Sequence, residues 1–335
     1  MKTTVKKLIS ALTFTFLSLS AFSVSLEDFS LSVEPLFGMK WGQVNEYVFS
    51  KKSKFSYDKL SELNWEIKPE WYCGLNVQGG WNQFFIETGV KFGIPRKTGL
   101  MIDSDWQNIE KTVAGGGNTV KTNYSESDNY LDHDISLGVK GGYKFYVNEN
   151  ITINPSIAYE YQTIKFTANG GTGWYGKSKP GGGLYPYDDI THQNVYNFSG
   201  KDVISYKREV SYLWLGSDFS FLAPYSNTLI FNTGFFFAPY VYAVSFDYHL
   251  IKEIDYADLT TGFFGAFKWN LGAEYKINDR HSILLNANYF FMRVLRGDDY
   301  EKKSSESNYK KSNEADGGAG ARYFDLCFSY RFKLF

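Results

Sequence analysis

After its first 25 residues the chain has no run of about 18 apolar residues, so no α-helix is expected to cross a membrane. The net charge of −1 argues against a nucleic-acid partner. Cysteine is scarce: Cys73 and Cys327 fall on separate predicted strands, and the sequence leaves open whether they are neighbours that form a disulfide. No cysteine lies near residues 23–25, where a signal peptide would be cleaved, which argues against a lipoprotein.

The N-terminus has the pattern of a secretory signal peptide. Lys2, Lys6 and Lys7 form a positive segment, residues 8–19 form an apolar core, and small residues before Glu27 offer cleavage points near 23–25. The alternative, a membrane anchor, is left open, although the apolar core is shorter than the roughly 20 residues of a spanning helix. We expect residues 1–25 to be a signal peptide and residues 26–335 to form the mature domain.

Aromatic residues make up 19% of the chain, and apolar positions recur with a period of two. In residues 135–147 the odd positions are apolar, aromatic or glycine, while the even positions from 136 to 144 are polar or glycine. In residues 263–277 most odd positions are apolar or aromatic, and they are opposed by Lys268, Asn270, Glu274 and Lys276. This period indicates strands with one apolar and one polar face. Abundant aromatics on such strands, without a spanning helix, are typical of a transmembrane β-barrel.

Short and long connections alternate along the chain. Polar turns are predicted near residues 82–83, 148–150, 226–227 and 278–280, and long loops at about 43–63, 98–129, 167–203, 248–258 and 296–319. These connections join ten strands, with both termini on the periplasmic side. The predicted fold is all-β: a ten-stranded antiparallel transmembrane β-barrel with long extracellular loops. Several strands exceed the roughly 9–11 residues that cross a bilayer, so the barrel is expected to project beyond the membrane.

Two triplets carry the chemistry of a candidate site. Asp103-Ser104-Asp105 follows the third predicted strand, and Asp247-Tyr248-His249 ends the seventh. Residues i and i+2 of an extended chain share one face, so each triplet presents two polar groups to the same space. Both strand ends lie on the loop side, and they belong to roughly opposite walls of a ten-stranded barrel. We therefore expect an extracellular groove with one triplet on each side.

The residue types in this groove suit hydrolysis by an activated water. His249 can take a proton from water near neutral pH, and Asp247 would orient the ring and stabilise its charged form. Asp103 and Asp105 are like charges held close, so we expect a raised pKa for at least one of them. Solvated rim charges are a simpler interpretation of either triplet alone. A metal site is another, but no third ligand at useful spacing is evident, and no cofactor is predicted.

The residues resemble one family. Met101-Ile102-Asp103-Ser104-Asp105-Trp106 is similar to the MVDxDW run of omptins, outer-membrane endopeptidases with a ten-stranded barrel, and Asp247-x-His249 matches the spacing of their Asp-His dyad. The resemblance continues through residues 42–49, 166–171, 204–207 and 318–320. It implies an aspartic-type endopeptidase of the bacterial outer membrane, with catalytic residues Asp103, Asp105, Asp247 and His249 and an active site facing outward.

The resemblance also assigns substrate-binding residues: Glu46, Met101, Ile204 and Ser245. In omptins, a Glu from the first loop and an Asp two residues before the dyad attract a basic residue before the scissile bond. Glu46 matches the first acid, but Ser245 stands at the second position. The family's preference for cutting between basic residues is therefore in question, although a basic preference stays possible.

Omptins depend on lipopolysaccharide held by basic groups on the outer wall. Their two main Arg positions align with Thr163 and Glu209, and Glu209 would repel a phosphate. Lys165, Lys207 and Arg208 lie near enough to substitute for them. We expect weak or absent lipopolysaccharide dependence.

The expected partners are polypeptide substrates at the cell surface and outer-membrane lipids. The alternative function is a non-catalytic barrel, acting as an adhesin through its long loops or as a small pore.

Overall fold

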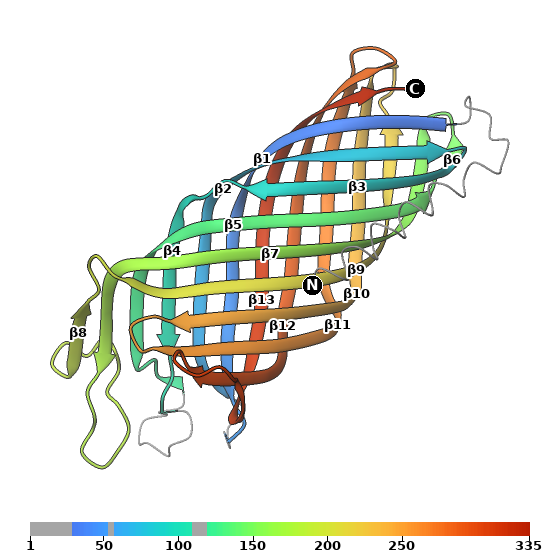
Figure 1. Ribbon diagram of the computed structural model, residues 1–335. Coiled ribbons are helices and arrows are strands. Elements are labelled where there is room, and N and C mark those ends of the chain that lie inside the picture. Colours follow the sequence, from blue (N-terminus) through green and yellow to red (C-terminus); the bar gives the residue numbers. More distant parts are fainter. Residues whose placement is uncertain (1–28, 53–56, 109–118) are drawn as a thin grey trace.

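The computed structural model describes residues 29–52, 57–108 and 119–335, and every named element within these ranges is a β-strand (Figure 1). The thirteen strands are β1 (Phe29–Ser50), β2 (Lys59–Trp81), β3 (Phe84–Gly93), β4 (Arg96–Asp105), β5 (Asn123–Tyr143), β6 (Phe145–Asn148), β7 (Ile151–Gly176), β8 (Gln193–Asn197), β9 (Asp202–Leu222), β10 (Leu229–His249), β11 (Ile254–Lys276), β12 (His281–Lys303) and β13 (Lys310–Lys333).

The strands close into one antiparallel barrel. β1 pairs with β2 on one side and with β13 on the other, so the first and last strands meet and the wall has no free edge. The strands run obliquely around the wall, and the longest hairpins extend from one end (Figure 1). The opposite end carries the short turns and the start of β1, where Phe29 packs beside Phe335.

Thirteen strands replace the predicted ten because two wall strands are interrupted and one strand lies outside the wall. β3 and β4 both pair with β2 and β5, so they are halves of one wall strand, interrupted at Ile94 and Pro95, since proline cannot donate to the ladder. β6 extends β5 beyond Lys144, and β8 pairs only with β7. The wall itself is ten strands wide, as predicted.

The long loops are shorter than predicted. Residues 43–50 continue β1, β7 runs to residue 176 and β13 begins at residue 310, so part of each of these predicted loops is strand. The polar composition of these segments suggested loops because their outer face meets water rather than lipid. Backbone pairing nevertheless continues beyond the membrane, and the barrel projects as a β-structured rim.

An outward-facing apolar belt marks the membrane-spanning part of the wall. On β10 it includes Phe231, Phe235, Tyr240 and Tyr242, whose side chains are exposed. Asp247 and His249 lie beyond this belt on the same strand, toward the long hairpins. No helix among the described residues is long and apolar enough to span a membrane. The predicted signal peptide, residues 1–25, lies outside the described residues.

The lumen changes character along its length. At the level of the belt it is polar, with ion pairs such as Lys40–Glu70 (2.9 Å) and Arg331–Glu274 (2.8 Å). Nearer the rim it is filled by an apolar cluster, in which Trp65 stacks between Phe166 and Tyr206 with ring centroids 5.6 and 5.5 Å away. Side chains therefore close the lumen beneath the rim. Cys73 faces outward and is exposed whereas Cys327 is buried, and the two form no disulfide.

Candidate active site at the rim

The Asp-His pair lies at the end of β10. Nε2 of His249 is 2.7 Å from Oδ2 of Asp247, and the Asp247 side chain is buried. Burial by itself would lower the pKa of His249, but the charge and hydrogen bond of Asp247 outweigh it and raise that pKa above its usual value of 6.5. The Tyr256 ring packs edge-on against the imidazole, with centroids 5.2 Å apart. Contacts on two sides therefore fix the orientation of His249.

The aspartate couple lies in the upper half of the third wall strand. Asp103 and Asp105 belong to β4 itself rather than to the loop after it, which corrects the predicted boundary. Burial, followed by the neighbouring charge of Asp105, raises the pKa of Asp103 to about 8. Oδ1 of Asp103 is buried and has no hydrogen-bond partner among the described residues, whereas Oδ2 of Asp105 accepts a bond from Asn123 (3.2 Å). Asp103 therefore holds a proton over most of the neutral pH range.

The two triplets interact across the lumen. The charge of Asp103 acts on His249, and the charges of His249 and Asp247 act on Asp103. Since β4 and β10 are four wall strands apart in a barrel ten strands wide, these side chains come from opposite walls. On each wall one buried carboxyl oxygen, Oδ1 of Asp103 or Oδ1 of Asp247, makes no hydrogen bond with the part of the chain that the structure describes. A water or a polar substrate group between the walls would satisfy both.

The four predicted substrate-binding residues divide into two groups. Met101 and Ile204 are buried in the apolar cluster. Glu46 is only 3% exposed, and its charge interacts with Asp247 and Asp103. Ser245 is buried and its hydroxyl lies 3.0 Å from the Tyr206 hydroxyl. Glu46 thus lies at the groove, while Ser245 is occupied by a neutral hydrogen bond.

Arg208 lies in the lumen and not on the outer wall. Its side chain is 1% exposed, and Nη1 donates a 2.8 Å hydrogen bond to the Gly320 carbonyl. Lys207 and Glu209 on either side face outward, so the period of two along β9 turns Arg208 inward. The prediction that Arg208 could replace a lipid-binding Arg is therefore wrong.

Three residues near the groove were missed in the sequence: Tyr256, Asp258 and Asp299. In β11, Tyr256 pairs with Asp247, and Asp258 pairs with Ser245. The sequence predicted a long loop at residues 248–258, but only residues 250–253 connect β10 to β11, and this short connection sets the register that brings Tyr256 and Asp258 to the site. Asp299 is reached only through the pairing of β11 with β12.

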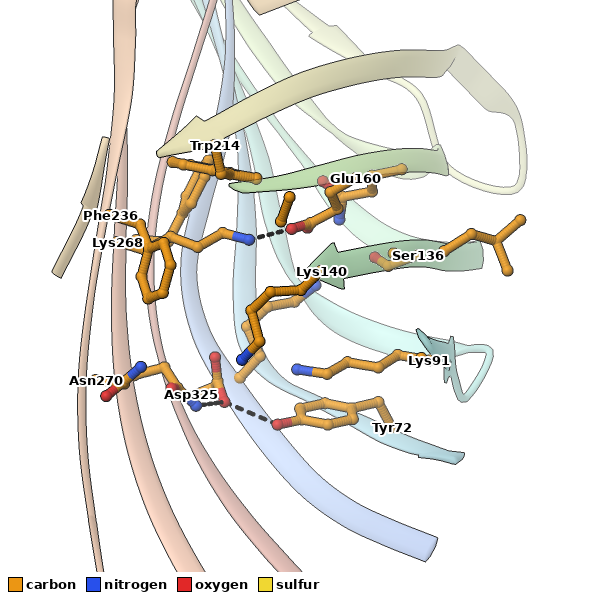
Figure 2. Close-up of a pocket in the computed structure, with 18 of the residues that line it drawn as sticks. Tyr72, Lys91, Ser136, Lys140, Glu160, Trp214, Phe236, Lys268, Asn270 and Asp325 are labelled. Carbon is orange, nitrogen blue, oxygen red and sulfur yellow. Dashed lines mark hydrogen bonds and ion pairs between the residues drawn. The ribbon is translucent and has the colours of Figure 1, made fainter. Parts of the chain in front are cut away.

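A cavity of about 280 Å³ lies below the site, in the polar part of the lumen. Figure 2 shows Lys91, Lys140 and Lys268 projecting into it, with Lys268 joined to Glu160 and Tyr72 joined to Asp325. Its lining contains cations and anions in similar number, and most of these are paired. The cavity therefore belongs to the polar lumen and not to the rim site.

Comparison with known proteins agrees with this architecture. The crystal structure of the outer membrane protease OmpT from Escherichia coli matches with a TM-score of 0.76 at 16% identity, covering 91% of this chain and 97% of that chain. The translocator domain of the autotransporter NalP from Neisseria meningitidis (TM-score 0.31, 6% identity, 97% and 96% covered) and a major outer membrane protein from Thermus thermophilus (0.27, 12%, 91% and 99%) match at low scores. A comparison with curated protein sequences finds no match.

The fold is a closed antiparallel β-barrel with the architecture of the outer membrane protease OmpT. The family model of the omptin family matches residues 27–334 of the 335-residue chain. The chain therefore belongs to the omptin family of outer-membrane proteases.

Proposed function

We propose that this protein is an endopeptidase that hydrolyses extracellular polypeptides with a water activated by Asp247 and His249, opposite Asp103 and Asp105. The observation that carries the proposal is the 2.7 Å contact of His249 with Asp247 opposite Asp103, whose pKa is raised to about 8. With Nε2 engaged by Asp247, Nδ1 of His249 is the nitrogen that accepts a proton from water.

The opposing couple supplies the complementary chemistry. Asp105 helps to hold the water through its carboxylate, and protonated Asp103 donates a hydrogen bond to the carbonyl oxygen or a proton to the leaving amine. The base, His249, and the acid, Asp103, therefore lie on opposite walls of the barrel. No covalent intermediate with the protein is required.

The groove favours a basic residue before the cleaved bond. Glu46 is buried beside Asp247, and the extracellular end of the barrel presents it to the substrate. Among the described residues Glu46 forms no ion pair, and Asp247 pairs only with His249. A basic substrate side chain would supply a positive partner for these acids.

The alternative of a small pore is disfavoured by the apolar cluster that fills the lumen beneath the rim. An adhesin remains the competing function. The deciding experiment incubates the refolded mature protein and its His249→Ala variant with a mixed peptide library and identifies cleavage sites by mass spectrometry. Cleavage by the wild type alone supports the protease. Absence of cleavage by a correctly folded wild type, with and without lipopolysaccharide, contradicts it.

Lipopolysaccharide dependence is proposed to be weak or absent. On the outer wall Lys165 pairs with Asp132 at 2.9 Å and Lys207 pairs with Glu209 at 2.5 Å, so each cation has an acidic partner within the protein. A lipid phosphate would have to displace these carboxylates and would meet their repulsion. Equal cleavage rates in detergent with and without added lipopolysaccharide are expected, and activity seen only with the lipid would contradict this proposal.

A further inference from the structure

The register of three neighbouring strands places two acids beside Ser245. Ser245 in β10 pairs with Asp258 in β11, and Asp258 pairs with Asp299 in β12. Both aspartates are buried, with 4% and 6% of their surface exposed. Like charges directly opposite each other on adjacent strands are destabilising, so this arrangement costs folding stability unless a ligand or a proton offsets it.

Gly317 allows the Asp258 side chain to reach across the wall. A Cβ atom built on Gly317 of β13 would lie 2.0 Å from Oδ1 of Asp258, so any larger residue there would displace the carboxyl group. β13 lies between β12 and β1, and the partner of Gly317 in β1 is Val48, close in sequence to Glu46. The Asp258 carboxyl group is thereby directed toward the strand that carries Glu46.

Glu46 meets these acids without a cation of its own. Its Oε2 atom is buried and makes no hydrogen bond with the described residues. Its strongest charge interactions are with Asp247, Asp258 and Asp299, all of the same sign. Burial and these charges raise the pKa of Glu46 well above its usual value.

Arg208 is a buried cation close to these acids, because its charge and those of Glu46 and Asp258 all act on the Tyr206 hydroxyl. Its Nη1 is bonded to the Gly320 carbonyl, and its ion pairs with either acid are absent among the described residues. The Arg208 guanidinium thus stands against the carboxyl groups of Glu46, Asp258 and Asp299, while Asp247 has His249 as its partner. The balance of buried charge at this wall is negative when the acids ionise.

We propose that Asp258, supported by Asp299, supplies from β11 the second carboxylate of the groove and, with Glu46, determines specificity by binding the ammonium or guanidinium group of a substrate side chain. The inference rests on the proposed function and adds to it the residues that recognise the substrate. Asp258, which lies on the neighbouring strand, then supplies the negative charge that Ser245 does not provide.

The spacing of the acids suits an organic cation. No group of three or more His, Cys, Asp or Glu among the described residues converges closely enough to ligate one metal ion. A guanidinium group is broad, carries five donors and binds separated carboxylates with directed hydrogen bonds. Without a cation, Asp258 keeps a proton and hydrogen-bonds to Asp299, and burial followed by the charge of Asp299 raises its pKa.

The test compares two peptides that differ only in Arg or citrulline before the cleaved bond. In Asp258→Asn we expect kcat/KM for the Arg peptide to fall at least about tenfold, because a desolvated charge pair is lost, with little change for the citrulline peptide. Asp299→Asn acts in the same direction with a smaller effect. Adding Ser245→Asp to Asp258→Asn restores the preference for Arg, because the charge returns on the adjacent strand.

Asp255→Asn is the matched control. Asp255 lies on the same strand and is buried, but it is neutralised by Lys302 at 3.0 Å, so its removal leaves the Arg-to-citrulline ratio unchanged. Gly317→Ala provides a second variant that displaces the Asp258 carboxyl group without removing it, and it too lowers the ratio. An unchanged ratio in a folded, active Asp258→Asn protein overturns the proposal, as does a wild-type preference for citrulline.

Binding separates this proposal from the proposed function. If the wild type cleaves neither peptide, fluorescence anisotropy of both labelled peptides on the wild type and on Asp258→Asn decides the matter. If the wild type binds the Arg peptide more tightly than the citrulline peptide, and Asp258→Asn does not, the cation subsite is supported even though the protease proposal fails. Equal binding of the two peptides to the wild type overturns the subsite.

Discussion

His249 and Asp247 are two positions apart on β10, and the same spacing that puts them on one face brings Nε2 and Oδ2 to 2.7 Å. The contact orients the ring and raises its pKa, and both effects have measurable consequences.

Asp247→Asn is expected to lower kcat by about 10²–10⁴-fold, because the amide neither stabilises the charged imidazole nor favours the same tautomer. The remaining activity should depend on a more acidic His249, so the acid limb of the kcat/KM profile moves to lower pH. Steady-state cleavage of a fluorogenic peptide from pH 5 to 9 measures both changes. An acid limb that stays in place would show that Asp247 does not set the pKa of His249.

The wild-type pH profile is expected to be bell-shaped. The pKa of His249 is raised above 6.5, so the imidazole becomes a base only above that pH, while Asp103 keeps its proton up to about pH 8. Activity therefore rises as His249 loses its proton and falls as Asp103 ionises. Asp103→Asn cannot lose a proton and should be slower without an alkaline limb. A wild-type rate that rises steadily beyond pH 9 would rule out an acidic role for Asp103.

Tyr256 is expected to position His249 through its ring. Tyr256→Phe retains the edge-on contact and should leave kcat within about threefold of wild type, whereas Tyr256→Leu removes the contact and should lower kcat about tenfold with little change in KM. Since a positioning role acts on the base, the acid limb should shift only in the Leu variant. Equal effects of the two substitutions would instead point to the hydroxyl group.

Removing a buried acid is expected to stabilise the barrel while it impairs recognition. Burial and four like charges raise the pKa of Glu46, so the folded state prefers the protonated form, and stability is lost as pH rises above its usual value of 4.5. Glu46→Gln abolishes this loss and should raise the midpoint of thermal unfolding at pH 8, by about 2–4 °C for each kcal/mol relieved. At pH 4 the two proteins should melt together. Circular dichroism in detergent makes the comparison, and a lower midpoint for the variant at pH 8 would refute it.

The sequence by itself determined the barrel and the two halves of its site. A period of two, many aromatics and the alternation of turns and loops define ten wall strands, because each strand must present an apolar face to lipid and each backbone group must be paired. The same period places Asp103 with Asp105, and Asp247 with His249, on shared faces. Here local geometry suffices, since residues two apart on a strand are neighbours whatever surrounds them.

The loops were overestimated for a local reason as well. Polarity separates lipid-facing from water-facing segments but not strand from loop, so the paired segments beyond the membrane in β1, β7 and β13 were taken for loops. Arg208 was misplaced because it was grouped by charge with Lys165 and Lys207 as a basic outer patch, while the strand period turns it inward.

Only the tertiary structure decided which acids meet at the groove. Glu46, Asp258 and Asp299 come from three strands, and their approach depends on pairing register and on the space that Gly317 leaves for one carboxyl group. Register across a closed barrel is set by all the strands together, so no single segment encodes it. Burial, which sets the protonation of Asp103 and Glu46, likewise arises from the packed wall and not from the residues alone.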